Sequence, residues 1–228
     1  MTATNQKLEL FEQQSVRSRK GLDAAIATSN YQLAALNCRQ GFKSRLMRGL
    51  VQWRSGDNPT GALTDCVGFH REAVQAMEGI GKSDFKITDS AIERVGFVVY
   101  LLDMEWSVFD LAGFKSDRQL DAVLSNSLFS AVDAVTWESG IKQLREHGSS
   151  LAVETYENYI AMRRGGEAGN SFTTLETCFT KRKKDKFFSG GEQTEGGGMD
   201  NEFVVDYRLA ALAKHAGLKD ESVHSWRW

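Results

Sequence analysis

The chain has 228 residues, of which 41% are hydrophobic and 25% are charged, and its formal net charge is −2. This composition is ordinary for a globular protein and excludes an intrinsically disordered chain. The nearly neutral balance gives no overall attraction to nucleic acid or to an anionic membrane. The length suits one large domain or two small ones, and we predict a single all-helical domain over residues 1–228.

The N-terminal sequence lacks the basic start and apolar run of a secretory signal. The longest apolar stretch, Val95–Leu102, is about half of the roughly 20 residues that span a bilayer. We therefore expect a cytoplasmic protein that does not enter a membrane. The three cysteines, Cys38, Cys66 and Cys178, form no CxxC pair and are odd in number, so we expect buried or half-buried free thiols.

Proline is nearly absent, since Pro59 is the only one, and this favours helices over a sheet-rich fold. We predict a helix from Asn30 to Trp53, ahead of the helix breaker Ser55–Pro59. A second helix is predicted to start near Pro59. Residues in the first turn of a helix do not use their backbone N–H within the helix, so proline, which lacks this group, is tolerated there. The apolar residues of the two helices recur at helical spacing and are Leu46, Leu50, Trp53, Leu63, Val67 and Val74.

Two capping-box sequences, Ser90–Glu93 and Ser116–Gln119, mark further helix starts. The first opens a predicted helix from Ala91 to Leu111, and its segment Val95–Leu111 is apolar on nearly every face. A helix of that kind must be surrounded by others, so we predict that it is the central helix of the fold. The alternative is a buried strand over Gly96–Leu102, but the length of the segment and its capping box favour the helix.

Later helices are predicted near Ala131–Glu146, Leu151–Arg164 and Val204–Ala216, joined by short connections that favour antiparallel hairpins. A flexible, basic and glycine-rich loop is predicted over residues 181–199, and no regular repeat is present. The predicted fold class is therefore all-α, an irregular antiparallel multi-helix bundle around the central apolar helix and not a solenoid. The basic run Lys181–Lys186 is interpreted as a solvated helix end, with a phosphate-binding patch as the alternative.

The sequence contains no recognisable catalytic or metal-binding motif. The four histidines form no HxxxH or HxH pattern, and there is no nucleophile elbow or SxxK sequence. A pair of catalytic carboxylates is not excluded, because 30 acidic residues offer many pairs. We predict that the protein is not an enzyme and that it has no catalytic, cofactor-binding or metal-binding residues and no cofactor.

Charge is unevenly distributed along the chain. Residues 1–60 hold 9 basic and 4 acidic residues, whereas residues 61–110 hold 4 basic and 9 acidic residues. We therefore expect the N-terminal helices to pack against the acidic middle of the chain.

Two acidic and aromatic groups are the candidate partner-binding residues. Asp103, Trp106 and Asp110 lie at i, i+3 and i+7 and would share one helix face that suits a basic partner. The alternative is that both carboxylates are bonded to arginines or helix N-termini inside the fold. A second group of the same kind is Glu154, Tyr156 and Glu157.

The C-terminal sequence ends in Trp226-Arg227-Trp228, whereas chain ends are usually polar. Two tryptophans in three residues favour a tail that folds back and buries apolar surface. An exposed hydrophobic docking tail is the alternative.

Two patches of the sequence resemble a known class of proteins. The early patch reads MRGLVQWRSGDNP, in which Trp53–Asp57 matches a turn that follows an early helix, and the late patch begins VVDYRLAALAKHAGL. Together with the helical layout, they resemble bacterial immunity proteins of polymorphic-toxin and type VI secretion systems. The nearest classes are the immunity protein 49 family and related all-helical immunity proteins that protect against nuclease toxins.

This resemblance implies an immunity protein, acting as an antitoxin, that binds a cognate protein toxin encoded by a neighbouring gene. Such proteins occlude the active site or the substrate path of the toxin, often through acidic surfaces, and have no catalytic residues. We expect no nucleic-acid or membrane partner, and a monomer or homodimer. The alternative function is a helical adaptor or regulatory module that binds proteins and has no toxin partner.

Overall fold

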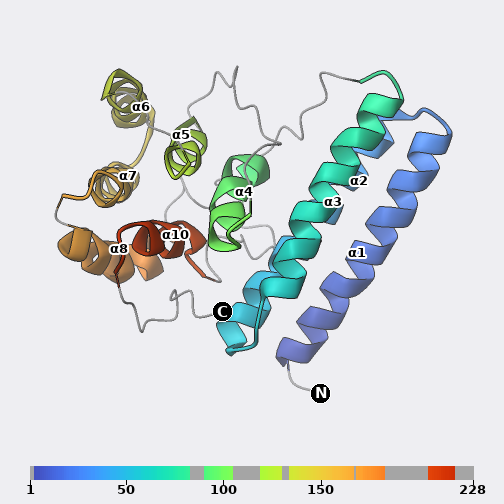
Figure 1. The fold of residues 1–228 in the computed structure, drawn as a ribbon, viewed down its shortest axis with the longest axis horizontal. Coiled ribbons are helices and arrows are strands. Elements are labelled where there is room, and N and C mark those ends of the chain that lie inside the picture. The colour runs from blue at the N-terminus through green and yellow to red at the C-terminus, as the bar shows by residue number, and fades with distance from the viewer. Residues whose placement is uncertain are drawn as a thin grey trace. The chain divides into compact units, whose positions relative to one another are not determined.

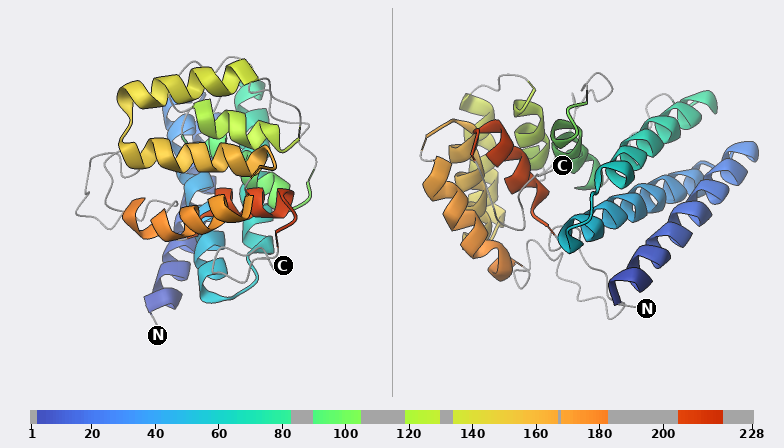
Figure 2. Two further views of the ribbon diagram at one scale, coloured as in Figure 1. Left: turned by 90° about the vertical axis from the view of Figure 1, so that its left-hand side faces the viewer. Right: turned by 60° about the horizontal axis from the view of Figure 1, so that its bottom comes forward.

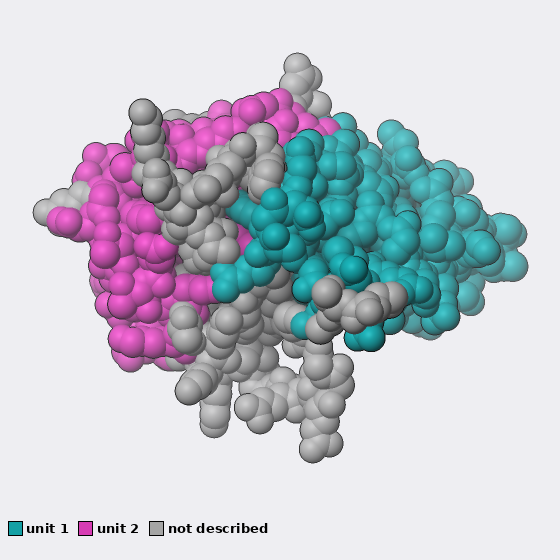
Figure 3. All heavy atoms as spheres, turned by 90° about the horizontal axis from the view of Figure 1, so that it is seen from below, with its two compact units in different colours: residues 1–95, 228 teal, residues 96–227 magenta. Residues whose placement is uncertain are grey.

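The computed structural model describes residues 3–82, 90–104, 119–129, 134–166, 168–182 and 205–218. These residues form helices and contain no strand, which confirms the predicted all-α class. The chain divides into two compact units, Met1–Val95 and Gly96–Arg227 (Figure 3). The arrangement of the chain as one domain around a central helix stays a prediction.

The first unit contains α1 (Ala3–Ala27), α2 (Tyr31–Ser55) and α3 (Thr60–Gly79), and α2 packs against both α1 and α3 (Figure 1). The N–H of Leu33 donates to the side chain of Asn30 at 3.1 Å, so this asparagine caps α2. Pro59 lies just before α3 and starts it without losing a hydrogen bond. The two helices predicted in this region are therefore confirmed, whereas α1 was not predicted as a separate helix.

Close contact between α2 and α3 depends on glycine. A Cβ atom on Gly41 would lie 2.4 Å from Cζ of Phe69, and one on Gly49 would lie 2.5 Å from Cδ2 of Leu63. Both distances are far shorter than a van der Waals contact, so only glycine lets these side chains pack directly on the α2 backbone. Phe69 and Leu63 are at most 2% exposed.

Ion pairs join α1 and α2 to α3, as the charge distribution predicts. The buried Arg45 places Nε 3.2 Å from Oδ2 of Asp65, and its guanidinium carbon lies 4.0 Å from the ring centroid of Phe69. Nη1 of Arg45 also donates to the carbonyl of Gly41 at 3.0 Å. Arg19 on α1 pairs with Glu72 on α3. Basic residues of the first two helices thus compensate acidic residues of the third.

The second unit stacks several short helices. It includes the end of α4 (Ser90–Leu101) and then α5 (Gln119–Ser127), α6 (Ala134–His147), α7 (Ser150–Arg163), α8 (Ala168–Arg182) and α10 (Tyr207–His215). The axes of α6, α7 and α8 run alongside one another (Figure 2). The predictions of α6, α7 and α10 are correct to within a few residues, and α8 was not predicted.

The position of α8 corrects the predicted loop. Lys181 and Arg182 are the last residues of α8, so the loop predicted over 181–199 does not begin at Lys181. The rest of that prediction, residues 183–199, lies outside the described residues, as does the predicted C-terminal tail.

The predicted central helix is wrong at its C-terminal end. Helix α4 ends at Leu101, and Leu102 and Asp103 form a turn in which Asp103 has a φ of +53°. Nζ of Lys214 donates to the carbonyls of Tyr100 and Leu101 at 3.3 and 3.1 Å, so it takes up backbone acceptors that end the helix. The apolar character of the segment is confirmed where it is described, because Phe97, Val98, Val99 and Leu101 are at most 1% exposed.

Hydrogen bonds hold the core of the second unit together. Tyr159 of α7 donates to Oδ2 of the buried Asp206 at 2.7 Å, and the rings of Phe97 and Tyr207 meet edge to face with centroids 6.4 Å apart. Nε of Arg163 donates to the carbonyl of Ser127 at 2.7 Å, at the last residue of α5. Arg163 therefore joins the end of α7 to the end of α5.

The three cysteines are free and buried, as predicted. Burial raises the pKa of the Cys38 thiol to about 11, and it also raises the pKa of the Cys66 thiol. Within the described ranges, every helix is too short or too polar to cross a bilayer.

Candidate functional site

Helices α6 and α7 form a tight antiparallel hairpin. Its turn contains Gly148, where a Cβ atom would lie 2.6 Å from the carbonyl oxygen of Leu144, so the close turn requires glycine. Ser149 caps α7 by accepting the N–H of Ala152 at 3.1 Å. The short turn fixes which residues of the two helices face each other.

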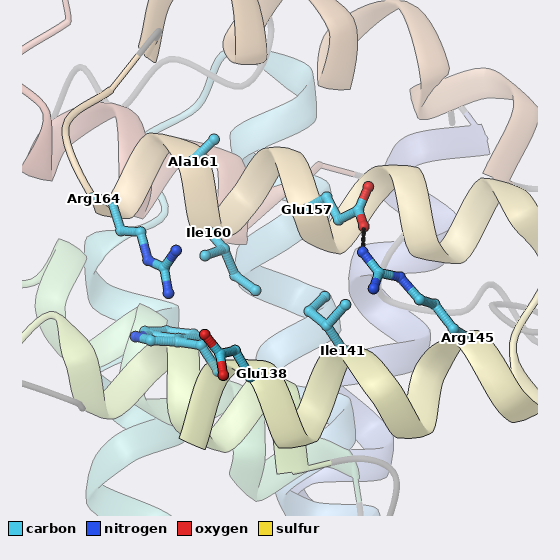
Figure 4. A pocket seen from close by; sticks show the side chains of 8 residues that line it. Glu138, Ile141, Arg145, Glu157, Ile160, Ala161 and Arg164 are labelled. Atoms are coloured by element: carbon cyan, nitrogen blue, oxygen red, sulfur yellow. Dashed lines mark hydrogen bonds and ion pairs between the residues drawn. The ribbon is translucent and has the colours of Figure 1, made fainter. Parts of the chain in front are cut away.

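A groove of about 310 Å³ lies between these two helices (Figure 4). Its apolar lining comes from Trp137 and Ile141 of α6 and from Ile160 and Ala161 of α7. The tryptophan and both isoleucines are at most 8% exposed, so they present an apolar floor that the rest of the hairpin holds in place. The charged lining residues are Glu138, Arg145, Glu157 and Arg164.

The charged residues stand at the two ends of the groove. Nη2 of Arg145 donates to Oε1 of Glu157 at 2.6 Å, and these side chains are 63% and 44% exposed. Glu138 and Arg164 lie toward the other end, with Ile141 and Ile160 between the two charged groups (Figure 4). An acidic and a basic group at each end can form ion pairs with a bound partner while the floor buries an apolar side chain.

The structure separates the residues of the second predicted group. Glu157 lines the groove, and Glu154 is exposed on the same helix. Tyr156 is only 6% exposed and packs edge to face against Tyr159 with centroids 5.7 Å apart. The expectation that Tyr156 presents an aromatic anchor beside the two glutamates is therefore wrong, because its ring belongs to the core.

The first predicted group does not form a helix face. Asp103 lies in the turn after α4, is 82% exposed at its side chain and accepts from Nζ of Lys214 at 2.8 Å. This carboxylate therefore departs from the alternative interpretation as well, because it is exposed rather than inside the fold and its partner is a lysine. Trp106 and Asp110 lie outside the described residues.

A second polar cluster surrounds Lys214. The hydroxyl of Tyr100 lies 3.1 Å from Nδ1 of His215. Burial raises the pKa of Tyr100, and the nearby Asp103 carboxylate adds to this; burial also lowers the pKa of His215, with the Arg163 charge acting in the same direction. Because Lys214 bonds to the backbone of α4, the cluster joins α10 to the end of that helix.

No family model, curated protein or solved structure matches the chain. Among the described residues, histidine, cysteine and acidic side chains form no group of three that could hold a metal ion.

Sequence reasoning identified only one of the charged groove residues, Glu157. It missed Glu138, Arg145 and Arg164 because each lies on a helix whose register against its neighbour is set by the turn at Gly148. The signal that could have identified Arg145 is its separation of 12 positions from Glu157 across a short turn, with opposite charge.

Proposed function

We propose that this protein is an immunity protein that neutralises a cognate bacterial toxin by binding it in the groove between α6 and α7. The observation that carries the proposal is the groove itself, with an apolar floor and an acidic and a basic residue at each end. The resemblance described above supplies the class of partner. Its early patch forms the turn after α2, where Gly56 has a φ of +82° and the N–H of Asp57 bonds to the carbonyl of Gln52.

The partner segment carries one aliphatic or aromatic side chain between two charged ones. Burying that side chain against Ile141 and Ile160 contributes about 1.5–3 kcal/mol. The charged neighbours pair with groove residues of opposite sign, which favours one orientation of the toxin segment and speeds association. Binding then blocks the active site or the substrate path of the toxin in the cytoplasm.

The test uses the toxin domain encoded beside this chain. The two proteins are co-expressed, growth of the host is followed, and the affinity of the purified pair is measured by calorimetry. We expect growth to be restored by the wild-type chain. Arg145→Glu should weaken binding at least tenfold, because it reverses a charge at one end of the groove, and that is about 1.4 kcal/mol or more. Lys142→Glu is the matched control, since it makes the same charge change on an exposed residue of α6 outside the groove.

A swap variant separates binding from folding. Arg145→Glu combined with Glu157→Arg keeps an ion pair between α6 and α7 but exchanges its ends. If the groove recognises the charges of the toxin, the swap variant stays folded by circular dichroism and still fails to neutralise. Equal affinities for all these variants would disprove the groove as the binding site, and no affinity for the neighbouring toxin would disprove the immunity function.

The helical adaptor is the alternative outcome of this experiment. The same groove can hold a charged peptide with a central apolar residue from a protein unrelated to any toxin. A chain that has no toxin gene beside it and binds such a peptide in a manner sensitive to Arg145→Glu would support the adaptor.

A further inference from the structure

The end of α10 is held on the end of α4 by two consecutive side chains. Nζ of Lys214 donates to the carbonyls of Tyr100 and Leu101 and to Oδ1 of Asp103, so each of its three N–H bonds has an acceptor. The next residue, His215, places Nδ1 3.1 Å from the hydroxyl of Tyr100, and the two ring centroids are 5.8 Å apart. We call these contacts the α4–α10 joint.

The joint is half-buried and lies near other side chains of the second unit. Tyr100, Lys214 and His215 are all partly exposed, and the ring of Phe129 packs edge to face on Tyr100 with centroids 5.6 Å apart. Burial lowers the pKa of His215, and the charge of Arg163 on α7 lowers it further. The imidazole is therefore more easily kept neutral in the joint than in water.

The charges around His215 do not favour a further positive charge. Lys214 precedes it on α10, Arg163 acts on it from α7, and Asp103 follows α4. Within the described part of the joint, Asp103 is the only carboxylate. It is bonded to Lys214 and its side chain is 82% exposed, so solvent screens its attraction for an imidazolium.

Protonation also changes the hydrogen bond to Tyr100. In a neutral imidazole one nitrogen accepts a hydrogen bond, whereas both nitrogens of an imidazolium donate. Nδ1 of neutral His215 can accept the phenol proton, but after protonation the bond persists only if the phenol oxygen becomes the acceptor. Burial raises the pKa of Tyr100, and Asp103 adds to this, so the phenol offers no negative charge to compensate.

We propose that the α4–α10 joint is pH-sensitive: it is closed when the imidazole of His215 is neutral and opens when that imidazole is protonated. Histidine is the side chain that ordinarily titrates between about pH 5 and pH 8. In the open joint the ring is in water, where its pKa is about 6.5. The open form therefore binds a proton more readily than the closed form, and a fall in pH through this value favours opening.

The rest of α10 remains in place when the joint opens. The rings of Phe97 and Tyr207 meet at the start of α10, with centroids 6.4 Å apart, and hold that end on α4. Opening is therefore confined to the last turn of α10 and to the turn that follows α4. This proposal does not rest on the groove between α6 and α7.

The test measures amide hydrogen exchange of the full chain by NMR at pH 7.5 and pH 5. The N–H groups of Leu102 and Asp103 report the joint, because they bond to the carbonyls of Val98 and Tyr100 in the turn that Lys214 holds. After correction for the intrinsic pH dependence of exchange, we expect their protection to fall roughly threefold or more at pH 5. Amides in the middle of α7 should keep theirs.

Three variants assign the effect to one imidazole. His215→Gln removes the titratable ring and should abolish the pH dependence, whereas His215→Lys places a permanent charge there and should give low protection at both pH values. His70→Gln is the matched control, because it removes a buried histidine of the first unit and should leave the pH dependence of Leu102 and Asp103 unchanged. Circular dichroism confirms that each variant folds.

An NMR titration of the His215 ring gives a second measurement, which does not depend on any variant. We expect a pKa below the ordinary value of about 6.5. A value at or above 6.5 would overturn the proposal, as would equal protection at the two pH values or a pH dependence that persists in His215→Gln.

Discussion

The hydroxyl of Tyr159 donates a 2.7 Å hydrogen bond to Oδ2 of Asp206, and both residues are at most 2% exposed. The other carboxylate oxygen accepts the N–H of Leu209 at 3.1 Å and so caps α10. One buried carboxyl group therefore both starts α10 and joins it to α7.

Substitutions of Tyr159 and of Asp206 should both destabilise the protein, but by different amounts. Tyr159→Phe removes one hydrogen bond and should lower the free energy of unfolding by about 1–3 kcal/mol. Asp206→Ala removes the helix cap as well and leaves the tyrosine hydroxyl buried without this acceptor, so we expect a larger loss, roughly 2–5 kcal/mol. Urea unfolding followed by circular dichroism measures both. Equal losses would show that the cap contributes nothing.

The buried His70 should make stability depend on pH. Burial lowers its pKa to about 4, and its ring packs edge to face against Phe42. In the unfolded chain the pKa is about 6.5, so between about pH 6.5 and pH 4 the unfolded state binds a proton that the folded state does not. The free energy of unfolding should fall over this window as pH falls, by at most about 3 kcal/mol.

The control for this prediction is His70→Gln, which has no titratable group at the same position. Urea unfolding of both proteins from pH 7.5 to 4 gives the difference curve, in which carboxylates common to both cancel. Parallel curves would show that the pKa of His70 is the same in the folded and unfolded states.

Gly41 should not tolerate alanine. The added Cβ would lie 2.4 Å from the Phe69 ring, which also packs under Arg45, so we expect a loss of about 1–3 kcal/mol. Gly68→Ala is the matched control, because nothing lies within 4 Å of its added Cβ in α3, and it should stabilise the helix by about 0.5–1 kcal/mol. Thermal melts compare the two. A similar gain for both would contradict the close contact between α2 and α3.

Ser29 and Gly56 both have a left-handed backbone conformation, and substitutions at these two positions should change the stability in opposite directions. Ser29, in the turn before α2, has a φ of +51°, so Ser29→Gly should stabilise by a few tenths to about 1 kcal/mol. Gly56 ends α2 with a φ of +82°, so Gly56→Ala should destabilise by about 1 kcal/mol. Changes of the same sign in urea unfolding would contradict these backbone conformations.

Two of the correctly predicted helices have residues at their starts that indicate a helix from the local sequence alone. Asn30 caps α2, and Pro59 precedes α3, so both starts could be predicted from the chemistry of single residues. Helix α1 lacks such a signal, because two of its buried positions are Ser15 and Ser18, which do not form an apolar stripe. Ser15 instead bonds to Ser44 of α2, a contact that no local pattern indicates.

Contacts between residues far apart in the chain explain the remaining differences between the predicted and the observed structure. The apolar run of α4 gave no sign of an end at Leu101, because the group that takes up its carbonyls is Lys214, from a helix far along the chain. The groove residues likewise depend on the register of α6 against α7. Tyr156 was assigned to the partner-binding group because it lies between two glutamates in the sequence, whereas its side chain faces the core.

The burial of all three thiols has a practical consequence for chemical labelling. A maleimide reacts with thiolate, and at neutral pH a thiol whose pKa is about 11, such as Cys38, is almost wholly protonated as well as inaccessible. A cysteine introduced at an exposed position such as Lys142 would therefore react far faster than the native ones. The natural chain can thus carry a dye at a chosen position without first replacing its own cysteines.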